Sequence, residues 1–220
     1  MDYNTIEIHW LGHAGFKIKD KSTKKIICID PFQLSEEEEK ADFIFITHSH
    51  YDHCSLEDIK KIIKPETEII VTTDVLSKLA KITPHPRSII VESSKEYKLK
   101  EIQFQTIPSY NINKKFHPKG NEWVGYNIYF SEGIKVYHAG DTDLISEMRN
   151  VQTDIALLPV DGTYTMNAEE AVRAATMIKP NLAIPMHWGS IIGTKEDAEK
   201  FLEGCKQKSI SAQILEKNAD

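Results

Sequence analysis

The stretch Phe43-Ile44-Phe45-Ile46-Thr47-His48-Ser49-His50-Tyr51-Asp52-His53 decides how the rest of this chain is interpreted. Its first four residues are apolar and β-favouring, which predicts a buried strand. Four potential metal ligands, His48, His50, Asp52 and His53, follow within six residues, so the strand delivers all of them into one loop at its carboxyl end. Imidazole nitrogens and carboxylate oxygens are favoured donors for divalent cations. A polar loop that is merely rich in histidine is the alternative, but the H-x-H-x-D-H spacing behind a strand favours a metal site.

Three further segments place a potential ligand or supporting group at the end of a predicted strand. Asp30-Pro31 closes the apolar strand at 25–29, Gly140-Asp141-Thr142 follows a later strand, and Pro185-Met186-His187-Trp188-Gly189 ends another. Taken singly, Asp141 is explained equally well as a turn residue and His187 as a core histidine. Because the segments recur behind strand ends in one chain, we interpret them together as parts of one site.

These motifs, in this order, resemble those of the metallo-β-lactamase superfamily of metal-dependent hydrolases. The resemblance runs from about residue 6 to residue 190. Within the superfamily, Trp10-Leu11-Gly12-His13-Ala14-Gly15-Phe16 looks like the ascorbate-6-phosphate lactonase-like branch. The resemblance implies an α/β fold, a four-layer αβ/βα sandwich. No linker-like stretch divides the sequence, so we expect a single hydrolase domain over residues 1–220.

The expected elements agree with that fold class. Several short strands come first in each half, and helices alternate with strands afterwards. The loop at 108–122 is long enough for a functional role to be expected. Asn167 and Glu170 form a capping-box pattern at the start of a helix. We also expect a short helix between Asp141 and Arg149 and a closing strand at 212–215.

The resemblance implies a dinuclear centre, with Asp30 supporting the metal-binding loop. The ligands that it implies are His48 and His50 for the first ion, Asp52, His53 and His187 for the second, and Asp141 as the bridge between them.

The superfamily usually supplies a third histidine to the first ion from the loop that begins near residue 108. Ser109-Tyr110-Asn111 stands at that place, and His117 follows seven residues after Tyr110. His117 is therefore the expected additional ligand, and the alternatives are that it contacts the substrate or donates a proton. Zinc is the expected metal, with manganese and iron as alternatives because they tolerate a carboxylate-rich shell.

Two divalent ions would activate water, lowering its pKa from 15.7 to about 7, and a metal-bound hydroxide would attack the substrate. Asp52 is expected to orient that hydroxide. His117, Tyr164 and His13 are candidates for protonating the leaving group, in that order, and His13 is otherwise a histidine satisfied by nearby backbone. Tyr110 and Tyr164 are expected beside the ligands or the substrate. Lys114 and Lys119 could supply positive charge for an anionic substrate.

Composition narrows the function further. The 220 residues are 40% hydrophobic, enough for a sizeable core, and the formal net charge of −6 argues against a nucleic acid partner. The sequence contains no apolar run of about 18 residues, so it predicts no membrane span. Three widely spaced cysteines suit a reducing cytoplasm.

We therefore expect a cytoplasmic hydrolase of a small, anionic ester, lactone or phosphodiester. The sequence leaves open whether the protein forms a homo-oligomer. The alternatives are a nuclease or phosphodiesterase acting on nucleic acid, and a metal-binding sensor without catalysis.

Overall fold

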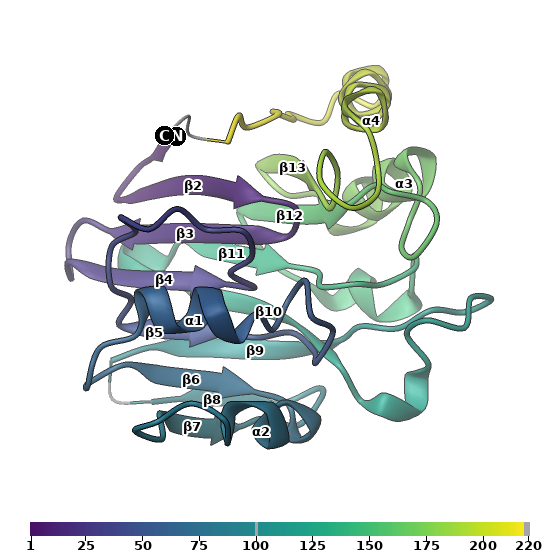
Figure 1. Ribbon diagram of the computed structural model, residues 1–220. Helices are drawn as coiled ribbons and strands as arrows, with labels where there is room; N and C mark the ends of the chain where they lie inside the picture. Colours follow the sequence, from purple (N-terminus) through teal and green to yellow (C-terminus); the bar gives the residue numbers. More distant parts are fainter. Residues whose placement is uncertain (100, 218–220) are drawn as a thin grey trace. The chain divides into compact units, whose positions relative to one another are not determined.

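The computed structural model describes residues 1–99 and 101–217 (Figure 1). The chain divides into two compact units. The N-terminal unit contains residues 1–91 together with 216–217, and the C-terminal unit contains the described residues of 92–215. Each unit has its own sheet and its own pair of α-helices.

The N-terminal unit contains a seven-stranded mixed sheet whose strands lie in chain order. The strands are antiparallel from β1 to β4 and parallel from β4 to β7. Carboxyl ends of neighbouring parallel strands lie at one edge, so the segments that follow β4 and β5 start side by side. The elements are β1 Asp2–Tyr3, β2 Ile6–Gly12, β3 Gly15–Asp20, β4 Lys25–Ile29, β5 Phe43–Phe45, α1 Leu56–Ile62, β6 Glu68–Val71, α2 Thr73–Leu79 and β7 Arg87–Ile90.

The apolar run of β5 is buried on both faces, as predicted. Phe43, Ile44 and Phe45 are all buried, because a parallel strand is covered on each side. Ile44 and Ile46 belong to a core cluster with residues from α1 and α2, including Ile59. This core holds the end of β5 and therefore the start of the histidine loop.

The C-terminal unit contains a six-stranded mixed sheet in the order β13-β12-β11-β10-β9-β8. Its strands are antiparallel from β8 to β11 and parallel from β11 to β13, so the progression seen in the N-terminal unit recurs. The elements are β8 Glu96–Lys98, β9 Gln103–Pro108, η1 Lys119–Asn121, β10 Val124–Tyr129, η2 Ser131–Gly133, β11 Lys135–His138, η3 Ser146–Asn150, β12 Ile155–Pro159, α3 Ala168–Ile178, β13 Leu182–Met186 and α4 Lys195–Gln207.

Local signals at the helix ends are partly confirmed. Asn167 and Glu170 form a reciprocal capping box at the start of α3. The helix expected after Asp141 is shorter than predicted, a 3-10 turn over Ser146–Asn150. The expected strand at 212–215 was wrong, because the segment makes one isolated bridge, between Ala212 and Ala183.

No described helix combines the length and the apolar character needed to cross a bilayer. The three cysteines are buried and form no disulfide. Burial raises the pKa of Cys28 to about 12 and that of Cys54 to about 11, so both thiols are unreactive. Cys54 is thus a packed residue beside the histidine loop, while the cytoplasmic location stays a prediction.

Candidate metal centre

Asp30 anchors the histidine loop of the N-terminal unit. Directly after β4, this fully buried carboxylate accepts hydrogen bonds from the backbone N–H of Thr47 at 2.8 Å and from its hydroxyl at 2.6 Å. Its Oδ2 also lies 2.7 Å from Nδ1 of His53. Asp30 therefore holds both the start of the loop and one of its imidazoles. The supporting role predicted for it agrees with this geometry.

His48 and His50 present their ring nitrogens to each other. Nε2 of His48 lies 3.0 Å from Nδ1 of His50, and the hydroxyl of Thr47 lies 3.0 Å from Nδ1 of His48. Two imidazole nitrogens at this separation are suited to a common cation, which accepts a lone pair from each. The predicted pair of ligands is therefore brought together within its own unit.

His13, Asp52 and His53 form a second group in the N-terminal unit. Nε2 of His13 lies 3.0 Å from Oδ2 of Asp52, and Nε2 of His53 lies 3.7 Å from the same oxygen. His13 is 1% exposed and occupies the turn between β2 and β3 with a φ of 53°. The turn thus aims His13 at Asp52, which favours the site role over a histidine satisfied by backbone alone.

Asp141 is the centre of the ligand group in the C-terminal unit. Its Oδ2 lies 3.1 Å from Nε2 of His117, and its Oδ1 lies 3.2 Å from Nε2 of His187. Each carboxylate oxygen therefore faces a different imidazole, the arrangement needed by a carboxylate that bridges two ions. Ser109 donates its hydroxyl proton to the carbonyl oxygen of Asp141 at 2.9 Å, which fixes the backbone behind the carboxylate.

Three imidazoles share one orientation. In His53, His117 and His187, Nδ1 faces a side-chain oxygen and Nε2 faces a carboxylate of the ligand group. Metal-binding histidines show this pattern, because the outer acceptor fixes the tautomer and leaves the other nitrogen for the ion. The partners are Asp30 at 2.7 Å, Asn111 at 3.0 Å and Asp161 at 2.9 Å, respectively.

Sequence reasoning missed Asn111 and Asp161. Asp161 comes two residues after β12, and its Oδ1 accepts the backbone N–H of Thr163 and Tyr164, which closes a turn. The signal for Asp161 was available, because Asp30 and Asp141 also stand just after strands. Asn111 carried no comparable signal, since an asparagine in a long loop is usually a turn residue.

The charges around His187 reinforce one another. Burial lowers the pKa of this imidazole, but the charge of Asp141 and hydrogen bonds to Asp141 and Asp161 outweigh it and raise the pKa to about 9. Burial raises the pKa of Asp161, while the contact with His187 and the hydrogen bonds from Thr165 and Tyr164 lower it overall. Asp141 and Asp161 thus favour positive charge at the position of His187.

Tyr110 and Tyr164 lie beside the ligands of this unit without joining them. The hydroxyl of Tyr110 donates to Glu147 at 3.2 Å and accepts from Lys119 at 3.3 Å. The ring of Tyr164 meets that of Phe116 edge-on, with centroids 4.6 Å apart. Their predicted roles beside the substrate stay predictions.

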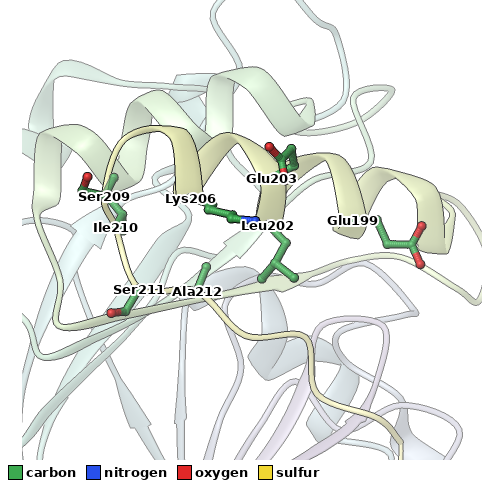
Figure 2. Close-up of a pocket in the computed structure, with 8 residues that line it drawn as sticks. All are labelled: Glu199, Leu202, Glu203, Lys206, Ser209, Ile210, Ser211 and Ala212. Atoms are coloured by element: carbon green, nitrogen blue, oxygen red, sulfur yellow. The ribbon is translucent and has the colours of Figure 1, made fainter.

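The donors of both units fit divalent cations. Five imidazoles and two carboxylates supply the nitrogen and oxygen atoms that such ions prefer, and three of the imidazoles are oriented by an outer oxygen. One surface groove of the C-terminal unit lies elsewhere. It has a volume of about 530 Å³ and is formed by α4 and residues 209–212 (Figure 2), and its lining contains none of the predicted ligands.

Comparison with known proteins identifies the family. A beta-lactamase superfamily domain matches residues 7–187. This chain belongs to the beta-lactamase superfamily. The superfamily member is 34% identical over 208 residues to a UPF0173 metal-dependent hydrolase of Thermoplasma acidophilum, with 89% of each chain covered. It is 30% identical over 226 residues to a UPF0173 metal-dependent hydrolase of Archaeoglobus fulgidus, with 96% of this chain and 95% of the relative covered.

Solved structures confirm the fold of this superfamily member. A Parabacteroides distasonis protein assigned as a metal-dependent hydrolase superimposes with a TM-score of 0.83 at 29% identity, covering 97% of this chain and 94% of that one. Igni18, a metallo hydrolase of Ignicoccus hospitalis, superimposes with a TM-score of 0.76 at 24% identity over 97% and 96%. The metallo-β-lactamase fold predicted from the sequence is confirmed, and the chain is a member of a family of metal-dependent hydrolases. Its place in the lactonase-like branch stays a prediction.

Proposed function

We propose that this superfamily member is a dinuclear hydrolase of small ester, lactone or phosphodiester substrates. The observation that carries the proposal is the shared orientation of His53, His117 and His187, each anchored at Nδ1 and presenting Nε2 to a carboxylate. Residues 1–220 act as one hydrolase domain in this proposal. The ligands that bind the two ions are His48, His50, His117, Asp141, Asp52, His53 and His187.

Bound ions would supply an activated water, with a pKa near 7 instead of 15.7, and would stabilise negative charge that develops on the substrate. The chain's own residues supply orientation and proton transfer. Asp52 orients the nucleophile, and His13, 3.0 Å from Asp52, holds that carboxylate in place. In this proposal His13 receives a proton from Asp52 or delivers one to the leaving group.

A cavity beside the ligands of the C-terminal unit supports a small substrate. It has a volume of about 470 Å³, and its lining includes Ser109, Tyr110, Lys119 and Trp123. Ser109 holds the backbone of Asp141, and the Trp123 ring contacts that of His117 with centroids 5.6 Å apart. Ser109 and Trp123 therefore both line the cavity and contact a proposed ligand, Asp141 and His117 respectively.

An anionic substrate is supported only in part by the lysines of this unit. Lys114 pairs with Asp143, and Lys119 lies 3.2 Å from Glu147 and 4.5 Å from the centre of the Tyr110 ring. Lys119 lines the cavity and is the cation we propose to meet a substrate carboxylate or phosphate. The hydrogen bonds that Lys119 donates to Tyr110 and Glu147, together with the charge of Glu147, raise the pKa of Lys119, so it stays charged.

Zinc is the proposed metal because imidazole nitrogen dominates the donor set. Manganese and iron remain the alternatives, since Asp52 and Asp141 add carboxylate oxygen. Elemental analysis of protein purified without added metal distinguishes them.

The test is hydrolysis of a panel of lactones, aryl esters and bis-aryl phosphodiesters by protein reconstituted with zinc, manganese or iron. Activity should fall by at least about 10³-fold in a His50→Ala/Asp141→Ala double variant, because a donor is lost from each unit. Lys206→Ala, in the groove of Figure 2, is the matched control and should retain full activity. Unchanged hydrolysis by the double variant would overturn the proposal.

A further inference from the structure

Asn111 contacts His117 in three ways, two through its side chain and one through its backbone. Its Oδ1 accepts the backbone N–H of His117 at 3.0 Å and lies 3.0 Å from Nδ1 of the same residue. The backbone N–H of Asn111 donates to the carbonyl oxygen of His117 at 2.7 Å. These bonds close the five residues between Asn111 and His117 into a loop. The side-chain amide of Asn111 thereby sets the position of His117.

The orientation of that amide is decided by the opposite side of Asn111. The other terminal atom of the side chain lies 3.1 Å from Oδ1 of Asp143 and 2.9 Å from the carbonyl oxygen of Tyr164. A carboxylate and a carbonyl oxygen only accept hydrogen bonds, so the atom that faces them must be the NH₂ group. The oxygen of the amide is consequently the atom that faces His117.

Asp143 is itself held so that it accepts from Asn111. Its Oδ2 accepts the backbone N–H of Ile112 at 2.9 Å, and its Oδ1 accepts from Lys114, which also donates to the carbonyl oxygen of Thr165 at 2.8 Å. Asp143 and Asn111 are both buried, and the ammonium group of Lys114 compensates the carboxylate. Both terminal atoms of Asn111 and both oxygens of Asp143 therefore have partners, which favours one rigid arrangement.

We propose that Asn111 is a positioning residue that makes His117 a metal ligand, and the inference rests on the dinuclear site proposed above. Because Oδ1 of Asn111 only accepts, His117 must carry a proton on Nδ1. Nε2 is then the nitrogen available to an ion beside Asp141, 3.1 Å away. The Asn111 network explains how a histidine seven residues beyond Tyr110 can replace one at the start of the loop.

Zinc affinity of the purified protein tests this role without any substrate. Asn111→Ala removes the acceptor, and one of the two bound zinc ions should be held about 10–100-fold more weakly in competition with a chromophoric chelator. Asn113→Ala, an exposed asparagine of the same loop, is the matched control and should bind both ions as the wild type does.

A charge-exchanged pair separates positioning from general support of the loop. In Asn111→Asp/Asp143→Asn, residue 111 still accepts from His117, and the new amide at 143 can donate to it. The carbonyl oxygen of Tyr164 loses its donor, so the free energy of unfolding should fall while the contact with His117 is kept. We expect zinc affinity within about three-fold of wild type, since the outer acceptor is retained. Affinity as weak as that of Asn111→Ala would overturn the proposal, and so would wild-type affinity in Asn111→Ala itself.

A spectroscopic measurement covers the case in which Asn111→Ala does not fold. In zinc-loaded wild-type protein, ¹⁵N-edited NMR should show a slowly exchanging Nδ1–H on His117 and no proton on its Nε2. A proton on Nε2 of His117 would overturn the proposal. Failure of the hydrolytic function would instead show as two ions bound with this tautomer and no turnover of any substrate in the panel.

Discussion

Asp30→Asn is the substitution that tests most directly how the histidine loop is built. Asparagine has nearly the same volume, and it tolerates the φ of 45° found at residue 30 better than most residues do. The substitution therefore changes hydrogen bonding and charge without creating a cavity. Asp30 accepts three bonds, two from Thr47 and one from His53, and an amide oxygen cannot replace both carboxylate oxygens.

The expected loss can be worked out for either orientation of the new amide. If its NH₂ group faces His53, it donates to Nδ1 and forces the proton onto Nε2, so that the imidazole can no longer bind an ion through Nε2. If its NH₂ group faces the backbone N–H of Thr47 instead, two donors meet in the buried core. One buried donor left unsatisfied costs about 1–3 kcal/mol of the free energy of unfolding. In the first orientation zinc affinity should fall by about 10–100-fold, because the outer acceptor of His53 is lost. In the second orientation the acceptor remains, and the loss appears in the free energy of unfolding.

Urea unfolding and chelator competition measure the two quantities separately. Asp20→Asn is the matched control, because Asp20 is also buried and accepts two backbone N–H groups, those of Ser22 and Thr23. Both bonds go to Oδ1 of Asp20, which an amide oxygen can replace, so the substitution should leave zinc affinity unchanged and change the free energy of unfolding little. If Asp30→Asn bound zinc as tightly as wild type and also unfolded with the wild-type free energy, the argument that Asp30 needs both oxygens to hold Thr47 and His53 would be refuted.

Three further predictions concern stability. Burial raises the pKa of Asp42, but the bonds from Lys64 at 2.9 Å and the Ile26 N–H at 2.8 Å outweigh it and lower the pKa. Asp42→Asn should therefore lower the free energy of unfolding by about 1 kcal/mol near neutral pH, a small value because solvent screens the partly exposed pair of Asp42 and Lys64. Because the pKa of Asp42 is lowered in the folded state, this loss should disappear as pH falls below about 4, which pH-dependent urea melts measure. An equal cost at pH 3 and pH 7 would contradict that assignment. In Gly125→Ala the new Cβ would lie 2.6 Å from the carbonyl oxygen of His138, so unfolding free energy should fall by about 1–3 kcal/mol, and an unchanged urea midpoint would be inconsistent with this contact. Chelation of bound metal should lower the melting temperature, because zinc at 100 times its Kd adds about 2.7 kcal/mol, and identical calorimetric traces with and without zinc would argue against a metal centre.

The buried strand and the histidine loop behind it could be predicted because their signals are local. A buried strand and the side chains directly behind it are adjacent in the chain, so the periodicity of Phe43–Ile46 and the spacing from His48 to His53 carry the prediction. Asp141 and His187 were found for the same reason, since each stands just after a strand, β11 and β13 respectively. The closing strand at 212–215 failed because β-pairing depends on an available partner edge, and one bridge to Ala183 is all that forms.

The sequence by itself determined the family, the succession of strands and helices, and which imidazoles and carboxylates stand at strand ends. Only the tertiary structure decided which oxygen holds each imidazole: Asp30 for His53, Asn111 for His117 and Asp161 for His187. The physical reason is that these partners are separated by 6 to 26 residues and meet only where turns and sheet edges bring them together. Hydrogen bonds require an approach of about 3 Å, and no spacing in a sequence encodes that approach for distant segments.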